Sequence, residues 1–526
     1  MAASAQLRSW PPRGLSKTGG RLAEALRMHG PSTRARLGET SGLSRPTVTT
    51  ALAELTERGF IEATTDASPE GLGRPAELVR LSRNAGLAVG VDIGRRHVQV
   101  VLADLGHQEI GKIPAEADAY RHPPSADAHP DEVLDKAALL VLDLLGRSGG
   151  TLEQVAAIGL GIPAPITHSG EIGSPTLLPG WAGISPAPAL SSRLAGVPVV
   201  VDNDANLGAL GEYLFGGFRD EHCTAEGYEL AYVKIATGIG AGIIRDGRIC
   251  QGAGGTAGEL GHTTLDFNDP KICLCGNHGC LELYAGGEAL LRKARTGLPE
   301  LADILDLIDR AKAGDPYCVS LIKDAGDQIG TALGTLVNLN SPDQIVIGGE
   351  LSDSGAILLD PIRERISRTA MPPAARAVTI SEARLKKWSS AWGAAALVLT
   401  SAPTRLWMRP EYAEAGNRQA QGLLGWLEFA PARGALPGLL ARWWFRGIDR
   451  ADGVPAIQAG GAGAGAARGV HAGGRGDRLG AGADADAGAP AGPSGAAEVL
   501  PPAGVFPRSG GGAAAGDRAH PRGAGT

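Results

Sequence analysis

The sequence has little cysteine, no excess of positive charge and no long apolar run. Six cysteines in 526 residues are too few for a secreted scaffold held by disulfides, whereas a clustered set is typical of metal binding or catalysis. The formal net charge of -6 excludes a global basic field for nucleic acid, so any DNA contact must come from a local patch. No apolar stretch reaches about 18 residues and the N-terminus lacks a signal-peptide pattern. We therefore expect a cytoplasmic protein without membrane contact.

The composition divides the chain into four parts. We expect a disordered N-terminus over residues 1–19, a mostly helical segment over 20–82, an α/β domain over 86–400 and a low-complexity or disordered tail over 401–526. In the third part, apolar strands alternate with helical stretches and Gly-rich turns, which is typical of α/β folds. There "HVQVVLADL" follows "LAVGVDIG" as the second arm of a hairpin, and the single stretch "LAYVKIATGIGAGII" reads as a further strand.

The end of the tail has an unusual composition. Residues 455–526 are nearly all Gly, Ala, Pro, Arg and Asp, and such a segment cannot bury enough apolar surface to offset its ordering entropy. Two origins fit this composition: a natural disordered tail, or out-of-frame translation of a GC-rich gene.

The helical segment near the N-terminus has the pattern of a winged helix-turn-helix. "SRPTVTTALAELTERGF" begins with Ser44 as N-cap and Pro46 in the first turn, and Val48, Leu52 and Leu55 form its buried face. Small hydroxyls and one arginine at a helix N-terminus suit phosphate and base-edge contacts in a major groove. The residues expected to contact DNA are Ser44, Arg45, Thr47, Thr50 and, at the tip of the following strand-loop-strand, Arg74. The alternative is a three-helix packing module without a DNA role.

Three glycine-bearing turns follow apolar strands in the α/β domain. Glycine lets backbone N–H groups approach phosphate oxygens, and an aspartate at a strand end can hold a magnesium ion or its water. The residues concerned are Asp92 and Gly94 in "VDIGRRH", Thr237, Gly238 and Gly240 in "KIATGIGAGII", and Gly348 and Gly349 in "VIGGEL". Each signal alone also fits an ordinary turn. Together they resemble the phosphate and adenosine elements of the actin-like sugar-kinase ATPase fold.

A polar cluster follows the apolar strand in "VVVDNDANLGALGE". Asn203 and Asp204 can bond sugar hydroxyls, and one carboxylate can accept a hydroxyl proton. The alternative is a strand-end turn that caps the next helix. Capping fits Asp202 better than Asn203 or Asp204.

Half of the cysteines lie in the loop "CLCGNHGCLE". With an upstream histidine they give His-x10-Cys-x-Cys-x4-Cys, and four such ligands suit tetrahedral zinc. The predicted ligands are His262, Cys273, Cys275 and Cys280, and glycines 276 and 279 let the chain turn tightly around the ion. Such an ion would bring Glu259, His262 and Glu282 close together. The alternative is three unpaired core cysteines, which is what we expect of the isolated Cys223, Cys250 and Cys318.

The motifs in their order resemble the ROK family (repressor, open reading frame, kinase). The resemblance runs from about Gly20 to Thr400 and rests on the winged helix, "DIG", "GIPAP", "DNDAN", "TGIGAG", "GELGH", "CLCGNHGCLE" and "IGGE". It implies a two-lobed fold with a sugar in the cleft and structural zinc beneath it. It also implies Asp204 as the base of any kinase reaction. The sugar contacts that it implies are Asn203, Asp204, Glu259, His262 and Glu282.

Two motifs depart from the family's kinases. Those kinases resemble "DIGGTK" where this chain has "DIGRRH", so Arg95 and Arg96 stand where backbone and a hydroxyl should meet phosphate. In "GIPAPI", Ala164 replaces a glycine near the sugar pocket. The first departure argues against use of ATP.

We therefore expect a sugar-responsive transcriptional regulator rather than an enzyme. It would bind operator DNA as a homodimer or dimer of dimers, and a sugar or sugar phosphate would alter lobe closure and the spacing of the recognition helices. The rival is an ATP- and Mg²⁺-dependent hexose kinase with a DNA-binding appendage, supported by Asp92, Asp204 and "TGIG". A third hypothesis, a zinc protein without a ligand, leaves the polar cluster without a role.

Overall fold

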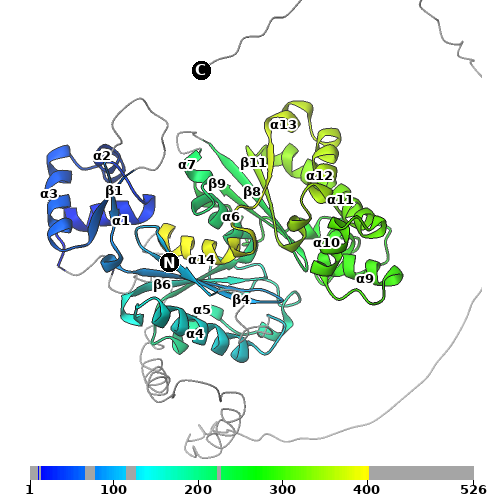
Figure 1. The fold of residues 1–526 in the computed structure, drawn as a ribbon, viewed down its shortest axis with the longest axis horizontal. Helices are drawn as coiled ribbons and strands as arrows, with labels where there is room; N and C mark the ends of the chain where they lie inside the picture. The colour runs from blue at the N-terminus through cyan, green and yellow to red at the C-terminus, as the bar shows by residue number, and fades with distance from the viewer. Residues whose placement is uncertain (1–9, 11–13, 66–76, 114–125, 222–226, 402–526) are drawn as a thin grey trace, which may run out of the picture. The chain divides into compact units, whose positions relative to one another are not determined.

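The computed structural model describes residues 10, 14–65, 77–113, 126–221 and 227–401 (Figure 1). Arg74, Cys223 and the tail beyond Ser401 lie outside the described residues. The described chain forms an N-terminal module with a two-stranded sheet, then two lobes that are each built on a five-stranded sheet. The predicted α/β class and two-lobed architecture are confirmed. No helix in these ranges is both long and apolar enough to cross a membrane.

The N-terminal module has three helices and a β-hairpin. Its elements are α1 (Lys17–His29), α2 (Arg34–Ser41), α3 (Arg45–Glu57), β1 (Ile61–Thr65) and β2 (Glu77–Leu81). The Ser16 side chain caps α1 by accepting from the Gly19 amide. The first helix therefore begins before Gly20, within the stretch expected to be disordered, and Trp10 is buried as well.

The hairpin and α3 complete a winged-helix arrangement. β1 and β2 pair antiparallel, and Ser32 adds a backbone bridge to Val79. Val48, Leu52 and Leu55 of α3 are buried, as their spacing predicted.

The first lobe surrounds a sheet in which the three middle strands are buried on both faces. In spatial order the strands are β5 (Glu109–Lys112), β4 (Val98–Asp104), β3 (Leu87–Ile93), β6 (Val155–Ile162) and β7 (Val199–Asn203). β3 and β4 form the predicted antiparallel hairpin, and β3, β6 and β7 run parallel. Helices α4 (Pro130–Arg147) and α5 (Pro186–Arg193) share one apolar core with this sheet.

The second lobe repeats the plan. Its strands, in spatial order, are β10 (Arg248–Ile249), β9 (Ile239–Arg245), β8 (Glu229–Ile235), β11 (Gln344–Gly348) and β12 (Thr379–Glu382). The stretch "LAYVKIATGIGAGII" forms the two antiparallel strands β8 and β9, and the chain reverses at residues 236–238, within the expected glycine-bearing turn. The helices of this lobe are α7 (Phe218–Glu221), α8 (Glu282–Ala285), α9 (Gly287–Gly297), α10 (Ile304–Lys312), α11 (Pro316–Asn340), α12 (Ala356–Thr369) and α13 (Pro372–Ala377).

Two helices fill the space between the sheets. α14 (Ser389–Thr400) packs on β3 and β6, and α6 (Asp204–Leu214) packs on β8, β9 and α14. Glycine makes these contacts close: a Cβ at Gly159 would overlap the Ala394 carbonyl, and one at Gly393 would overlap the Leu207 carbonyl. Backbone therefore meets backbone in this layer, which fixes α6 and its first residue, Asp204, at the carboxyl end of β7.

Candidate functional site

A cleft opens where β3, β7 and the β8–β9 turn end. Its volume is about 790 Å³, including the part open to solvent. The cleft brings together most of the residues that the sequence predicted for sugar and phosphate: Gly94, Asn203, Asp204, Thr237, Gly238, Gly240, Glu259, His262 and Glu282. Asp92, Gly348 and Gly349 do not line it.

Asn203 has a structural role that we had assigned to its neighbour. Its Oδ1 accepts from the backbone N–H groups of Ala205 and Asn206 at 2.9 and 3.2 Å and so caps α6. Its Nδ2 donates to the Ala164 carbonyl at 3.1 Å. Asp202, expected to be the cap, is instead buried and accepts from the Asn206 side chain at 2.9 Å. The reason is geometric: the residue just before the first helical turn is Asn203, so its side chain reaches the free N–H groups.

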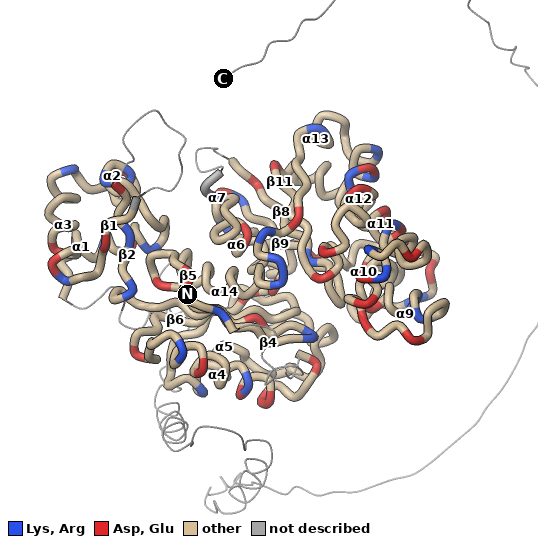
Figure 2. The backbone as a smooth tube through the Cα atoms, in the orientation of Figure 1, with Lys and Arg blue, Asp and Glu red and all other residues tan. Residues whose placement is uncertain are grey.

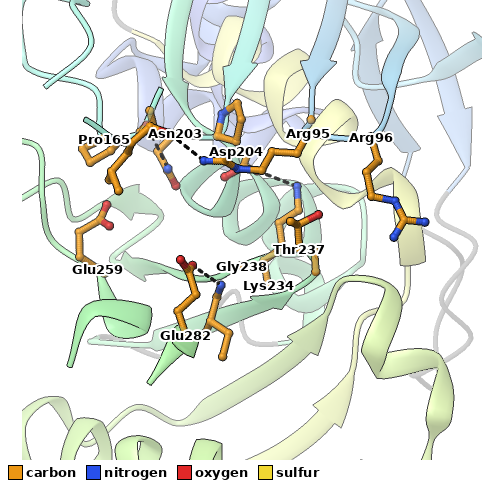
Figure 3. A pocket seen from close by; sticks show the side chains of 18 of the residues that line it. Arg95, Arg96, Pro165, Asn203, Asp204, Lys234, Thr237, Gly238, Glu259 and Glu282 are labelled. Atoms are coloured by element: carbon orange, nitrogen blue, oxygen red, sulfur yellow. Dashed lines mark hydrogen bonds and ion pairs between the residues drawn. The ribbon is translucent and has the colours of Figure 1, made fainter. Parts of the chain in front are cut away.

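Carboxylates approach the same open space from several elements (Figure 3). Glu282, at the start of α8, accepts from the Ile239 amide at 3.0 Å. Burial, followed by the nearby Asp204 and Glu282 carboxylates, raises the pKa of Glu259 to about 7. Such a group both donates and accepts hydrogen bonds near neutral pH, which suits recognition of sugar hydroxyls.

His262 joins this carboxylate group to the cysteine loop. Its Nε2 lies 3.7 Å from Glu259 Oε2, and its Nδ1 lies 3.5 Å from Cys273 Sγ. A metal-ligating histidine commonly presents its second nitrogen to a carboxylate in this way.

The four predicted metal ligands form one compact cluster. The ligand atoms of His262, Cys273, Cys275 and Cys280 all lie within 4.8 Å of one another, and Cys275 Sγ is 3.7 Å from Cys280 Sγ. Ligand atoms about 3.4–3.8 Å apart match a tetrahedron with Zn–S and Zn–N bonds of about 2.0–2.3 Å. Burial, followed by hydrogen bonding to Cys275, raises the pKa of the Cys280 thiol to about 12. A bound cation would therefore be needed to hold these sulfurs as thiolates. The residues fit a zinc ion.

The remaining cysteines differ from one another. Cys318 is fully buried on α11, as expected of a core residue, whereas Cys250 is only half-buried.

The phosphate turn of the cleft is occupied by side chains of the chain itself. Arg95 donates to Asp127 and to the Leu177 carbonyl, both at 2.8 Å. Arg96 lies 3.9 Å from the Asp303 carboxylate. Both arginines line the cleft, so the predicted bulk is present at this turn.

Two basic partners of Asp92 and Asp204 were not predicted from the sequence. His97 Nε2 lies 2.8 Å from Asp92 Oδ2, and Lys234 Nζ lies 2.9 Å from Asp204 Oδ2. Burial opposes ionisation of Asp92, but Lys234 and then His97 hold its pKa below the ordinary value. The carboxylates expected to serve magnesium and proton transfer are thus already paired, and their arrangement does not fit a Mg²⁺–ATP complex. The one available signal was a lysine in the apolar run "LAYVKIA".

The expected DNA-contacting residues gather at the start of α3. Ser44, Arg45 and Thr50 are exposed and Thr47 is half-exposed. The Ser44 hydroxyl also caps α3 by accepting from the Thr47 amide at 3.4 Å. Elsewhere on the described chain, positive and negative residues are interspersed (Figure 2). The candidate DNA-contacting surface is therefore limited to the start of α3.

Comparison with known proteins places the chain. The ROK family model matches residues 88–401, which is more than half of the chain. The chain belongs to the ROK family. It is 28% identical to a xylose repressor of Bacillus spizizenii over 72% of this chain and 94% of that protein. It is 31% identical to a glucokinase of Streptomyces coelicolor over 54% of this chain and 88% of the kinase.

A solved structure extends the likeness to the N-terminal module. The crystal structure of a ROK family transcriptional regulator, a homolog of the E. coli MLC protein, matches with a TM-score of 0.56 and 26% identity. The match covers 77% of this chain and 97% of that one.

We expect one zinc ion per chain, lost in Cys275→Ser. Because structural zinc contributes on the order of 10 kcal/mol to folding in small zinc peptides, the variant should also melt at a lower temperature. Plasma emission spectrometry of the purified protein measures the metal. The matched control is Cys250→Ser, which changes a half-buried cysteine outside the cluster and should keep its zinc. Well-folded wild-type protein that contains no zinc would refute the assignment.

Proposed function

We propose that this ROK protein is a sugar-responsive repressor whose cleft binds a sugar without consuming it. The observation that carries the proposal is the union, in one chain, of a winged helix and a ROK cleft. The repressor match covers 72% of the chain and the glucokinase match 54%.

The winged helix supplies the DNA-binding surface of this proposal. The apolar face of α3 is buried against the module, which leaves Arg45, Thr47 and Thr50 on the outward side at its N-terminal end. A recognition helix reads base edges through its N-terminal residues, and dimers place two such helices one DNA turn apart. We therefore propose that a homodimer binds a two-fold operator through α3.

The cleft supplies the effector site. Asp204, Glu259, His262 and Glu282 offer hydrogen-bonding groups in the number that a polyol requires, over a zinc-supported loop. A site built around particular hydroxyls discriminates strongly, because a wrong sugar leaves buried groups unpaired. The relatives named as xylose repressors suggest a pentose as the class to test, and those named as glucokinases suggest a hexose.

The second candidate is a hexose kinase with a DNA-binding module. It is favoured by Asp204 at the N-terminus of α6 and by the likeness to glucokinases. It is opposed by the pairing of Asp92 and Asp204 with cationic side chains. Phosphoryl transfer depends on placement, and an error of about 1 Å can cost roughly a hundredfold in rate.

Arg45→Ala should weaken operator binding and reduce the slope of log affinity against log salt by about 1, since one phosphate contact is lost. The measurement is fluorescence anisotropy of the full-length protein on a DNA fragment selected from a random library. Arg363→Ala, an exposed arginine on α12, is the matched control and should bind as wild type does. Equal affinity and equal salt slopes for Arg45→Ala and wild type would place the DNA surface elsewhere.

A further inference from the structure

One buried lysine of the cleft lies close to two aspartates, Asp204 in the cleft and Asp92 behind it in the core. Lys234 lies on β8, its side chain is 13% exposed, and its Nζ is 2.9 Å from Asp204 Oδ2 and 4.0 Å from Asp92 Oδ2. Its third neighbour is the Ser390 hydroxyl at 3.2 Å. Figure 3 shows this side chain reaching toward Asp204 from the floor of the cleft. A single ammonium thus lies among the groups that a magnesium-dependent kinase would use.

The lysine remains protonated in this setting. Burial alone would lower its pKa, but the Asp204 and Asp92 carboxylates outweigh that effect and raise the pKa above the ordinary value. Asp92 is fully buried, and its Oδ1 has no hydrogen-bond partner. A buried carboxylate needs compensating positive charge, and Lys234 supplies it, while His97 forms a hydrogen bond with Asp92 Oδ2.

An ammonium at this position changes what the cleft can bind. Mg²⁺ requires oxygen ligands in near-ideal octahedral geometry and would have to compete with a fixed positive charge for the same oxygens. The ion pair between Lys234 and Asp204 holds Asp204 in one orientation, with its other oxygen available to accept from a hydroxyl.

We propose that Lys234 is a built-in substitute for the metal ion: a positioning residue that orients Asp204 for a sugar hydroxyl and excludes Mg²⁺ from the cleft. This inference rests on the proposed function in that the cleft's ligand is a sugar. It adds that sugar binding requires neither Mg²⁺ nor nucleotide in the cleft.

The test compares full-length wild type with Lys234→Met by calorimetric titration with MgCl₂ alone, and with D-xylose and D-glucose in the presence and absence of Mg²⁺. Wild type should bind no Mg²⁺ in the cleft and should bind sugar equally with or without it. Lys234→Met should bind Mg²⁺, and its sugar affinity without Mg²⁺ should fall by about tenfold, the loss expected for a charge-assisted contact. Lys293→Met, a half-buried lysine on α9 that donates to the Tyr284 carbonyl, should match wild type.

Each outcome separates this inference from the proposed function. If Lys234→Met binds sugar as wild type does and gains no Mg²⁺, Lys234 has no such role. If wild type binds neither sugar, the proposed effector class fails, while the Mg²⁺ titration still tests the lysine. If Lys234→Met does not fold, Lys234→Arg retains the charge and should still exclude Mg²⁺, and Mg²⁺ binding by that variant would overturn the inference.

A different observation carries a second inference, on how the cleft communicates with the DNA-binding module. Arg27 of α1 is fully buried. Its Nη1 donates to the carbonyls of Val398 and Leu399 at 2.6 and 2.9 Å, and its Nη2 donates to that of Ser401 at 2.7 Å. The last carbonyls of a helix have no partner within the helix and attract positive charge. An arginine of the N-terminal module therefore caps the C-terminus of α14.

The other end of α14 reaches the cleft. Ser390, in its first turn, donates to the Asp204 carbonyl at 2.8 Å and contacts Lys234. Between these ends the helix is held by close backbone contacts: a Cβ at Gly90 or Gly211 would overlap the carbonyl of Ala391 or Ser389. A helix so tightly packed moves with its neighbours as a rigid body, because a packed layer has few alternative arrangements.

We infer that α14 transmits effector binding to the winged helix and that Arg27 is the coupling residue. A sugar that shifts Asp204 would shift Ser390, and the rigid helix would carry the change to its C-terminal carbonyls and to α1. The inference rests on the proposed function and assigns it a route.

The test is the ratio of DNA dissociation constants with and without saturating sugar, for full-length wild type and Arg27→Met. Coupling between two sites typically changes the affinity at one of them by about 5- to 150-fold, and we expect a ratio of this size for the wild type. For Arg27→Met the ratio should fall to within about twofold of one, because sugar binding then no longer affects the DNA-binding module. Arg83→Met is the control, because Arg83 lies between β2 and β3 and donates to the Ser148 carbonyl, not to α14. An unchanged ratio in Arg27→Met would overturn the route.

Hydrogen exchange keeps this inference distinct from the proposed function. Sugar binding should change hydrogen exchange in both α14 and α1 of the wild type. In Arg27→Met it should change hydrogen exchange in α14 alone. Changes in α1 that persist in the variant would exclude Arg27 as the link. If sugar has no effect on the DNA affinity of wild type, the proposed function fails. If sugar then changes hydrogen exchange only in the cleft, α14 is also excluded as the route.

Discussion

The architecture depends on the direct backbone packing of α14 between the first sheet and α6. Gly90 and Gly159 open the sheet face, and Gly211 and Gly393 let the two helices meet without intervening side chains. That contact fixes the start of α6, and so Asp204, beside the ends of β3 and β7. It also leaves the C-terminal carbonyls of α14 free to accept hydrogen bonds from Arg27 of the N-terminal module. The cleft and the N-terminal module thus contact opposite ends of one short helix.

The charges around the cleft argue against phosphoryl transfer and favour the proposed sensor. A kinase must leave its carboxylates free to hold a metal ion and to accept a proton. Here His97 pairs with Asp92, Lys234 pairs with Asp204, and two arginines stand at the phosphate turn. The groups that face the sugar side, Glu259 and Glu282, stay available. Such a cleft can recognise a polyol in its ground state, which is all that a sensor requires.

Local patterns explain what the sequence revealed. The spacing of His262 and the three cysteines predicted a cluster that the structure brings within 4.8 Å, because three of its members share one loop. The alternation of strands and helices predicted the α/β class, and the resemblance to the ROK family implied the two lobes that the structure shows. Capping was assigned to Asp202 instead of Asn203, since a one-residue difference in where a helix starts cannot be read from composition. Arg74 and the tail, by contrast, lie outside the described residues.

Long-range partners explain what the sequence did not reveal. Lys234 is one charge in an apolar strand, and its partners lie 30 and 156 positions away along the chain. Arg27 resembles any arginine near a helix end, yet its acceptors are more than 370 positions away. No local period or spacing encodes such pairs, and only the folded chain shows that they connect the cleft to α14 and α14 to the winged helix.

The central claim is that a sugar acts on this protein as a signal and not as a substrate. The direct measurement is the affinity of the full-length protein for its selected DNA, by fluorescence anisotropy, across a panel of aldopentoses, aldohexoses and their phosphates with no nucleotide or Mg²⁺ added. The account predicts that at least one of them changes the dissociation constant by about 5- to 150-fold and is recovered chemically unchanged after incubation with MgATP. Conversion of that sugar to its phosphate at a rate near the enzyme norm of about 10 per second, with DNA affinity unaffected by any sugar, would contradict it.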